Sequence, residues 1–194
     1  GCDVVALTLS AEQARFARKR MRAAGLENQV EIRIQDYRDV EGHFDKIASI
    51  EMFEAVGEEN WPAYFDALKR CLKSGGKAGL QVITIDDSRF DFYRRNPDFI
   101  QRYIFPGGML PSPQAFENAV ELANLRVTEQ TYFGKSYAET LRRWGAAFHE
   151  NWPRIERLGF DPRFRRMWDY YLRYCEAGFD EGRIDVGQFT IERA

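Results

Sequence analysis

The stretch Phe44-Asp-Lys-Ile-Ala-Ser-Ile-Glu-Met-Phe-Glu-Ala-Val-Gly57 decides the fold of this chain. Its apolar run, Ile47 to Ile50, is typical of a buried parallel strand. Two carboxylates, Glu51 and Glu54, follow where that strand should end. Ligands of open α/β sheets bind at the carboxyl ends of strands, so the stretch predicts a site there. On spacing alone the alternative is favoured, in which both glutamates lie on the solvated first turn of a helix.

Length and composition narrow the class of protein. The chain has 194 residues and a net charge of −2, which allows one domain and argues against binding nucleic acid by bulk electrostatics. Three separated cysteines, Cys2, Cys71 and Cys175, predict neither a disulfide framework nor a metal site. The sequence shows no signal peptide and no transmembrane segment.

Hydrophobic patterns predict an α/β fold along the rest of the chain. Val30–Ile34 alternates as a strand, and Ser74-Gly-Gly76 ends a helix that begins near Asn60. The order strand, helix, strand, strand, helix, strand indicates a doubly wound, mostly parallel sheet. Strands are expected at 3–9, 30–34, 44–50, 77–85, 125–133 and 184–191, and helices at 10–25, 60–72, 112–123, 136–148 and 161–172.

Three local features add to this outline. Ser10 with Gln13, and Ser136 with Glu139, have the spacing of capping boxes that open helices. Residues 86–124 form a predicted insertion around the apolar loop Ile104–Pro111, which is typical of a lid. The alternative for this loop is that it folds onto the core. The aromatic residues, 14% of the chain, indicate either a large core or a wall around an apolar or cationic ligand.

General sequence motifs leave the function open. We find no GxGxxG, Walker A, GxSxG or HExxH motif, and the two histidines, His43 and His149, are isolated. Pattern alone therefore predicts an α/β domain with an aromatic insertion.

Several blocks in register, from end to end of the chain, resemble the cyclopropane-fatty-acyl-phospholipid synthase family. These blocks are Thr8-Leu-Ser-Ala-Glu-Gln13, Gln35-Asp-Tyr-Arg-Asp39, Ser49-Ile-Glu-Met-Phe-Glu-Ala-Val-Gly57, Tyr103-Ile-Phe-Pro-Gly-Gly-Met-Leu-Pro-Ser112, Phe133-Gly-Lys-Ser-Tyr137 and Arg166-Met-Trp-Asp-Tyr-Tyr-Leu172. The resemblance implies a class I, Rossmann-like methyltransferase fold that uses S-adenosylmethionine. Members add a methylene or methyl carbon to cis double bonds of membrane-lipid acyl chains, and relatives methylate small amines.

The resemblance also implies site residues. The implied cofactor contacts are Thr8, Leu9, Ser10, Gln13, Asp36, Tyr37, Arg38 and Ser49. Glu54 and Tyr137 are implied to hold a bicarbonate ion beside the reactive methyl, and the backbone of Ile83 joins that site. Gln81 stands where many members have a histidine, and an amide binds an anion but does not titrate near neutral pH. That departure leaves a methyl branch without ring closure as an alternative to a cyclopropane.

These residue types suit the chemistry. An alkene that attacks a sulfonium methyl leaves a carbocation, and closing the ring needs a base that takes a proton from the new methyl group. A small anion held by a carboxyl and a phenol would serve as that base. We expect Glu54 beside an anion to favour its protonated form.

A second departure concerns the family's first strand and its glycine-rich loop, which are not in this sequence. We therefore expect 1–194 to be the carboxy-terminal part of one methyltransferase domain, inactive by itself. We expect the strands at Val4–Leu9 and Ile47–Ile50 to pair directly, or a second copy to supply contacts in a homodimer.

The predicted activity is that of a cytoplasmic enzyme, peripheral to the inner membrane surface, acting on unsaturated phospholipid chains. One alternative is a small-molecule N-methyltransferase of the same family. The other is a lipid-binding or structural remnant without catalysis.

Overall fold

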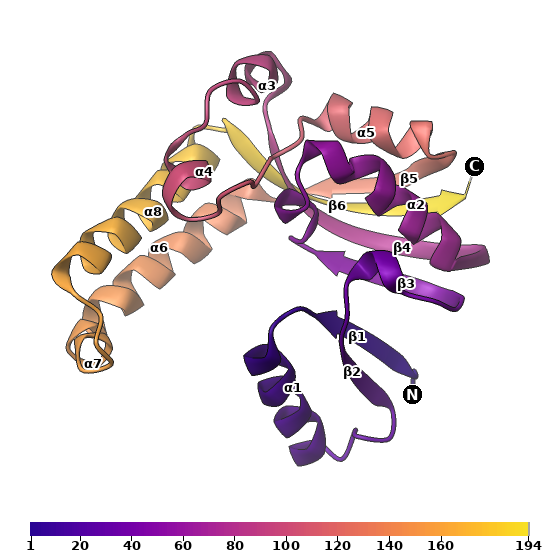
Figure 1. Ribbon diagram of the computed structural model, residues 1–194. Coiled ribbons are helices and arrows are strands. Elements are labelled where there is room, and N and C mark those ends of the chain that lie inside the picture. The colour runs from indigo at the N-terminus through magenta and orange to yellow at the C-terminus, as the bar shows by residue number, and fades with distance from the viewer. Residues whose placement is uncertain (194) are drawn as a thin grey trace. The chain divides into compact units, whose positions relative to one another are not determined.

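Two separate sheets divide the chain into two units (Figure 1). In the computed structural model, which describes residues 1–193, the first unit is Gly1–His43 and the second begins at Phe44. The first unit has a two-stranded sheet, and the second has a four-stranded sheet of order β3-β4-β6-β5.

The first unit consists of β1 (Val4–Thr8), α1 (Ala11–Ala23), β2 (Val30–Ile34) and a short 3-10 helix, η1 (Tyr37–Asp39). The two strands are parallel, in a continuous register from Val4–Val30 to Thr8–Ile34. The Ser10 side chain accepts a hydrogen bond from the backbone of Gln13, which caps α1 as predicted. The Gln13 side chain bonds instead to Thr8, so only half of the first capping box forms.

The second unit contains the remaining elements. They are β3 (Phe44–Ile50), η2 (Phe53–Ala55), η3 (Glu58–Asn60), α2 (Trp61–Cys71), β4 (Leu72–Ile85), α3 (Asp87–Tyr93), α4 (Phe99–Tyr103), α5 (Pro113–Leu122), β5 (Leu125–Tyr132), α6 (Gly134–Glu150), α7 (Trp152–Glu156), α8 (Pro162–Asp180) and β6 (Ile184–Arg193). Strand β3 pairs with β4 in parallel, and β6 runs antiparallel to both β4 and β5. The chain is therefore an α/β protein, and its second sheet combines the parallel pair β3–β4 with the antiparallel pairs β4–β6 and β6–β5.

Some element boundaries differ from the predictions. Strand β4 begins at Leu72 and absorbs the glycine-rich turn through an irregular register against β3. Helix α6 begins at Gly134, because the Gly134 backbone donates to the Asp185 carboxylate at 2.8 Å. The capping box predicted at Ser136 and Glu139 is therefore wrong, and the Glu139 carboxylate bonds to Arg142 instead.

An aromatic core anchors the sheet of the second unit. Phe53 is 1% exposed, and its ring lies 5.0–5.4 Å from the rings of four aromatic neighbours. These neighbours are Trp61, Tyr64, Phe65 and Phe116. Helices α2 and α5, which carry all four, lie side by side on one face of the sheet (Figure 1). Phe53 thereby fixes the turn that follows β3, where the two predicted glutamates lie.

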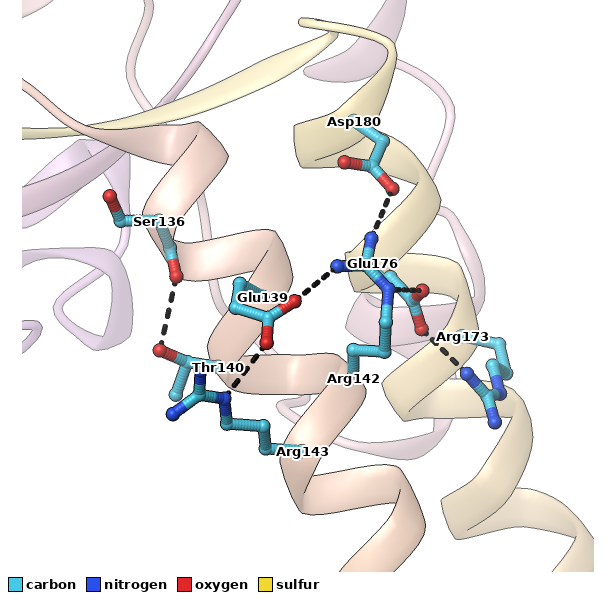
Figure 2. Close-up of polar contacts among 8 residues, drawn as sticks. All are labelled: Ser136, Glu139, Thr140, Arg142, Arg143, Arg173, Glu176 and Asp180. Carbon is cyan, nitrogen blue, oxygen red and sulfur yellow. Dashed lines mark hydrogen bonds and ion pairs between the residues drawn. The ribbon is translucent and has the colours of Figure 1, made fainter.

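Helices α6 and α8 run side by side and extend beyond the sheet (Figure 1). Figure 2 shows that the Arg142 guanidinium of α6 reaches Glu139 on its own helix and Glu176 and Asp180 on α8. The two latter ion pairs are 3.0 and 2.9 Å long. Together with a buried apolar cluster between the helices, they hold the helix that carries Tyr137.

Strands β1 and β3 each have one paired edge among the described residues. Among residues 1–193, β1 pairs only with β2, and β3 pairs only with β4. Direct pairing of the strands at Val4–Leu9 and Ile47–Ile50, which lie in different units, stays a prediction. Pairing with a second copy in a homodimer stays a prediction.

Candidate active site

Glu51 lies at the carboxyl end of β3, in an uncommon backbone conformation. Its φ is 51°, in the left-handed region that costs a non-glycine residue about 1–2 kcal/mol. Its backbone N–H donates to the carbonyl of Gln81 at 2.8 Å, which ties the turn to β4. Such conformations persist where the surrounding structure imposes them, and they concentrate at functional sites.

The Glu51 carboxylate is the centre of a hydrogen-bond cluster. The Tyr137 hydroxyl, from α6, lies 2.8 Å from each of its two oxygens. The Gln81 amide, from β4, donates to Oε1 at 2.7 Å. The Gln188 side-chain amide of β6 donates to the side-chain amide oxygen of Gln81 at 3.0 Å, so the N–H₂ group of Gln81 points at Glu51. Burial and the bond to Glu51 raise the pKa of Tyr137, which therefore stays a neutral donor.

Glu54 lies in η2 beside this cluster and has a different environment. Its Oε1 accepts from the Ile83 backbone at 2.6 Å, and its own carbonyl accepts from the Met109 backbone at 2.8 Å. The second bond ties η2 to the insertion. Its Oε2 is buried and has no hydrogen-bond partner among the described residues. Burial raises the pKa of Glu54 to about 7, so a large fraction of this carboxyl is protonated at neutral pH.

The predicted arrangement around a bicarbonate ion stays a prediction, and the hydrogen bonds of Glu51 bear on how well such an ion would fit. Tyr137 and Gln81, the predicted donors to that ion, both bond to Glu51 instead of meeting Glu54 around an anion. The residues present do not fit a bicarbonate held in the predicted way, because a carboxylate of the chain takes its donors. From the sequence, Glu51 and Glu54 together predicted a site at the end of this strand, but only Glu54 was given a chemical role.

Ser49 lies in β3 and already has a partner. Its hydroxyl accepts a hydrogen bond from the Tyr64 hydroxyl of α2 at 2.7 Å. The bond places a polar pair beside the aromatic core. A contact from Ser49 to a cofactor stays a prediction.

The predicted cofactor residues of the first unit form two polar turns after its strands. After β1, the Thr8 hydroxyl donates to Gln13 at 2.6 Å and accepts from the Ser10 backbone at 3.1 Å. Leu9, between them, is 74% exposed, which leaves an apolar side chain free to pack on a ligand ring.

The turn after β2 contains Asp36, Tyr37 and Arg38. The Asp36 carboxylate accepts from the Arg38 backbone at 2.9 Å and from its guanidinium at 2.7 Å. These bonds lower the pKa of Asp36 to about 2, so the group is ionised at neutral pH. An ionised carboxylate and an exposed apolar side chain suit the hydroxyl, amino and ring groups of a nucleoside, so these residues fit S-adenosylmethionine.

The described part of the chain has neither a membrane-spanning helix nor a metal-binding cluster. No helix there is long and apolar enough to cross a membrane. No group of histidine, cysteine, aspartate and glutamate side chains in residues 1–193 is arranged to hold a metal ion.

Comparison with known protein families matches residues 1–189 to mycolic acid cyclopropane synthetase. The chain belongs to this family. Among curated relatives, tuberculostearic acid methyltransferase UfaA1 of Mycobacterium tuberculosis is 45% identical over the whole chain, which covers 45% of that protein. The cyclopropane-fatty-acyl-phospholipid synthase of Escherichia coli K12 is 38% identical over 98% of the chain, which covers 47% of it. The chain thus spans about half the length of these relatives.

Solved structures agree with this membership of the cyclopropane synthetase family. The crystal structure of mycolic acid cyclopropane synthase CmaA1 with SAH and CTAB matches 98% of the chain and 70% of its own, at 29% identity and a TM-score of 0.90. A sarcosine dimethylglycine methyltransferase from Galdieria sulphuraria, at 14% identity and a TM-score of 0.80, shares the fold. The class I methyltransferase fold predicted from the sequence is confirmed.

Proposed function

We propose that this member of the cyclopropane synthetase family transfers one carbon from S-adenosylmethionine to the cis double bond of a phospholipid acyl chain. The product would be a cyclopropane or a methyl-branched chain. The observation that carries the proposal is the cluster of Glu51, Glu54, Tyr137 and Gln81 at the carboxyl end of β3. It combines an acceptor for a proton with neutral donors, which the removal of a proton from carbon requires.

S-adenosylmethionine, when bound, would supply the electrophilic methyl group. Thr8, Ser10 and Gln13 would contact its amino-acid and ribose parts, and the turn of Asp36 to Arg38 would lie along its adenine. We base these roles on the family and on the ionised Asp36 carboxylate. Residues of the second unit would stabilise the positive charge that develops on the acyl chain.

Aromatic rings suit an acyl chain that carries a positive charge. Tyr137 lies 4.9 Å from the ring of Phe179, and Phe105 of the insertion lies 6.1 Å from Tyr171 of α8. Ring faces attract cations, and apolar walls exclude the water that would quench one. We therefore assign the insertion of residues 86–124 to the acyl chain, as a cover over it.

The exposed surface of the same insertion supports action at a membrane. Phe92, Tyr103 and Phe105 are 71%, 60% and 54% exposed. Exposed aromatic side chains of this kind favour the interface between lipid and water. We propose that the enzyme is cytoplasmic and acts from the membrane surface.

We do not include bicarbonate in the proposed reaction. The Tyr137 hydroxyl and the Gln81 amide, which would bind it, are both engaged by Glu51 at 2.8 and 2.7 Å. The unpartnered Oε2 of Glu54 is the remaining buried polar atom beside this cluster.

Lipid analysis of a host that expresses the full-length protein tests the proposal. We expect mass spectrometry to show unsaturated phospholipid chains converted to chains heavier by one CH₂. A host that expresses the Tyr137→Phe variant at the same level is the matched control. An unchanged acyl profile with purified, folded enzyme would refute the lipid substrate, and methylation of small amines in the same assay would support the N-methyltransferase alternative.

For the 194-residue chain alone, we propose weak cofactor binding and no turnover. Strands β1 and β3 each have one partner among the described residues, whereas a nucleoside site at strand ends requires the sheet around it to be fixed. Titration calorimetry with S-adenosylmethionine, with the full-length enzyme as control, measures this. Micromolar binding by the 194-residue chain would contradict the proposal.

A further inference from the structure

Glu51 and Glu54, the two carboxyl groups of this site, have opposite hydrogen-bonding environments. Glu51 accepts hydrogen bonds from Tyr137 and Gln81, two groups that stay neutral and act here as donors. Glu54 is buried with one unpartnered oxygen, an arrangement that favours its neutral form. When neighbouring carboxyls have such different environments, one is suited to act as a base and the other as an acid.

The position of Glu51 is held from several directions. Its backbone N–H bonds to Gln81, and its left-handed φ turns the side chain at the strand end. Tyr137 reaches it from α6, and Gln188 orients Gln81 from β6. Three elements distant in sequence thus fix one carboxylate, which is how a protein pre-organises a reacting group.

We propose that the Glu51 carboxylate is the base of the reaction, built into the chain in place of an external anion. This inference rests on the proposed function. After the methyl group has joined one carbon of the former double bond, the other carbon lacks an electron pair. Glu51 accepts a proton from the new methyl group, and the electron pair of that C–H bond forms the C–C bond that closes the ring. The protonated Glu51 carboxyl then releases its proton to water.

The hydrogen bonds to Glu51 also address a competing reaction, in which the carboxylate would form an ester with the cation. Tyr137 lies 2.8 Å from both oxygens, and Gln81 adds a third contact to Oε1. Donors on both oxygens hold the plane of the carboxylate and reduce its nucleophilic character. Tyr137 and Gln81 are therefore positioning residues for Glu51.

The test uses the full-length enzyme with S-adenosylmethionine and vesicles of cis-unsaturated phospholipid, in buffer freed of bicarbonate. We expect wild-type turnover to be unchanged, within about twofold, when bicarbonate is added back. We expect Glu51→Gln to lower turnover by about 10²-fold or more, the scale of a lost general base. Glu59→Gln, which removes an exposed carboxylate nearby in the sequence, is the matched control with unchanged turnover.

Two further readouts separate a base from a structural role. Calorimetric affinity for S-adenosylhomocysteine should be the same in wild type and Glu51→Gln. The residual product of Glu51→Gln should shift toward chains heavier by one CH₂ and one water, because an undeprotonated cation is trapped by water. In Glu51→Gly, which leaves space at the carboxylate position, added formate or bicarbonate should restore turnover at least about tenfold.

Each contrary result identifies what has failed. Wild-type turnover that depends on bicarbonate, together with an active Glu51→Gln variant, would overturn the built-in base and leave the proposed function intact. A wild-type enzyme that changes no acyl chain would overturn the proposed function, and this inference with it.

Discussion

The two units of this protein differ in how much core they bury. In the first unit, Ala14 and Val40 are the buried apolar side chains among the described residues. The second unit buries the aromatic cluster around Phe53, the strands beneath it, and a separate cluster between α6 and α8. The predicted nucleoside contacts of residues 8–38 belong to the first unit, which has the small core, whereas the proposed acid–base groups belong to the well-packed second unit. Acid–base chemistry requires side chains held to a fraction of an ångström, and dense packing provides this.

The largest difference between the two units should be in the free energy of unfolding that is lost when a side chain is truncated. We expect Phe53→Ala to lower the free energy of unfolding of the 194-residue chain by about 3–5 kcal/mol, because the cavity left among four rings cannot close. Phe16→Ala in α1, where the ring is 63% exposed, should change it by less than about 0.5 kcal/mol. Urea unfolding measures both. Equal losses in the free energy of unfolding would mean that the core of the first unit contributes as much stability as that of the second.

The pH dependence of stability should have opposite signs in the two units. Burial raises the pKa of Glu54 from 4.5 to about 7, so the folded state binds the proton more tightly than the unfolded state. Its contribution is fully present below about pH 4.5 and is lost as pH rises through 7, by up to about 3 kcal/mol. The pKa of Asp36 is lowered from 3.8 to about 2, so its contribution to stability has the opposite sign. That contribution is fully present above pH 3.8 and is lost as pH falls through 2.

Urea unfolding of the full-length protein at about pH 5 and about pH 8 measures the Glu54 effect. The Glu54→Gln variant, which carries a neutral side chain of the same shape, should lose less stability than wild type over this range. Identical curves for the two proteins would show that Glu54 is ionised throughout.

Substitutions in the first unit should change cofactor affinity, and substitutions in the second unit should change turnover. In the full-length enzyme, we expect Tyr137→Phe to cut turnover by about 10²-fold while the Kd for S-adenosylmethionine changes by less than about twofold. Asp36→Asn should raise that Kd by about tenfold, because a charged acceptor is lost, and leave turnover at saturation nearly unchanged. Steady-state kinetics and calorimetry distinguish the two outcomes, and a reversed pattern would refute the division.

The smallest effect should come from the surface of the α6–α8 pair. Arg142→Ala removes the three ion pairs that Arg142 makes in Figure 2, where the arginine side chain is 45% exposed. We expect a small drop in the melting temperature at low salt that disappears in about 1 M salt, because exposed pairs are screened. A drop that persists in high salt would indicate lost packing instead.

Much of the secondary structure could be predicted from local patterns. Ser10, Ser112 and Asp161 cap helices at the predicted positions, because a short polar side chain there accepts a backbone N–H whatever the rest of the chain does. The capping box at Ser136 failed because Asp185, far along the chain, binds the Gly134 backbone and starts the helix earlier. Helices α3 and α4 were also not predicted individually, since their short apolar patterns resemble those of a loop.

The amino-acid sequence places two carboxylates after an apolar strand, and its six blocks indicate the family. Which of the two carboxylates meets Tyr137 depends on the folded chain. The tyrosine lies 86 residues from Glu51 in sequence, and local patterns carry no information about contacts at that distance. The left-handed backbone at Glu51, imposed by pairing with β4, turns this carboxylate toward Tyr137. Burial raises the pKa of Glu54 to about 7, although the hydrogen bond from the Ile83 backbone opposes that shift, and Glu54 is therefore partly protonated at neutral pH. Pairing and burial are properties of the folded chain, so the division of roles between the two glutamates appears only there.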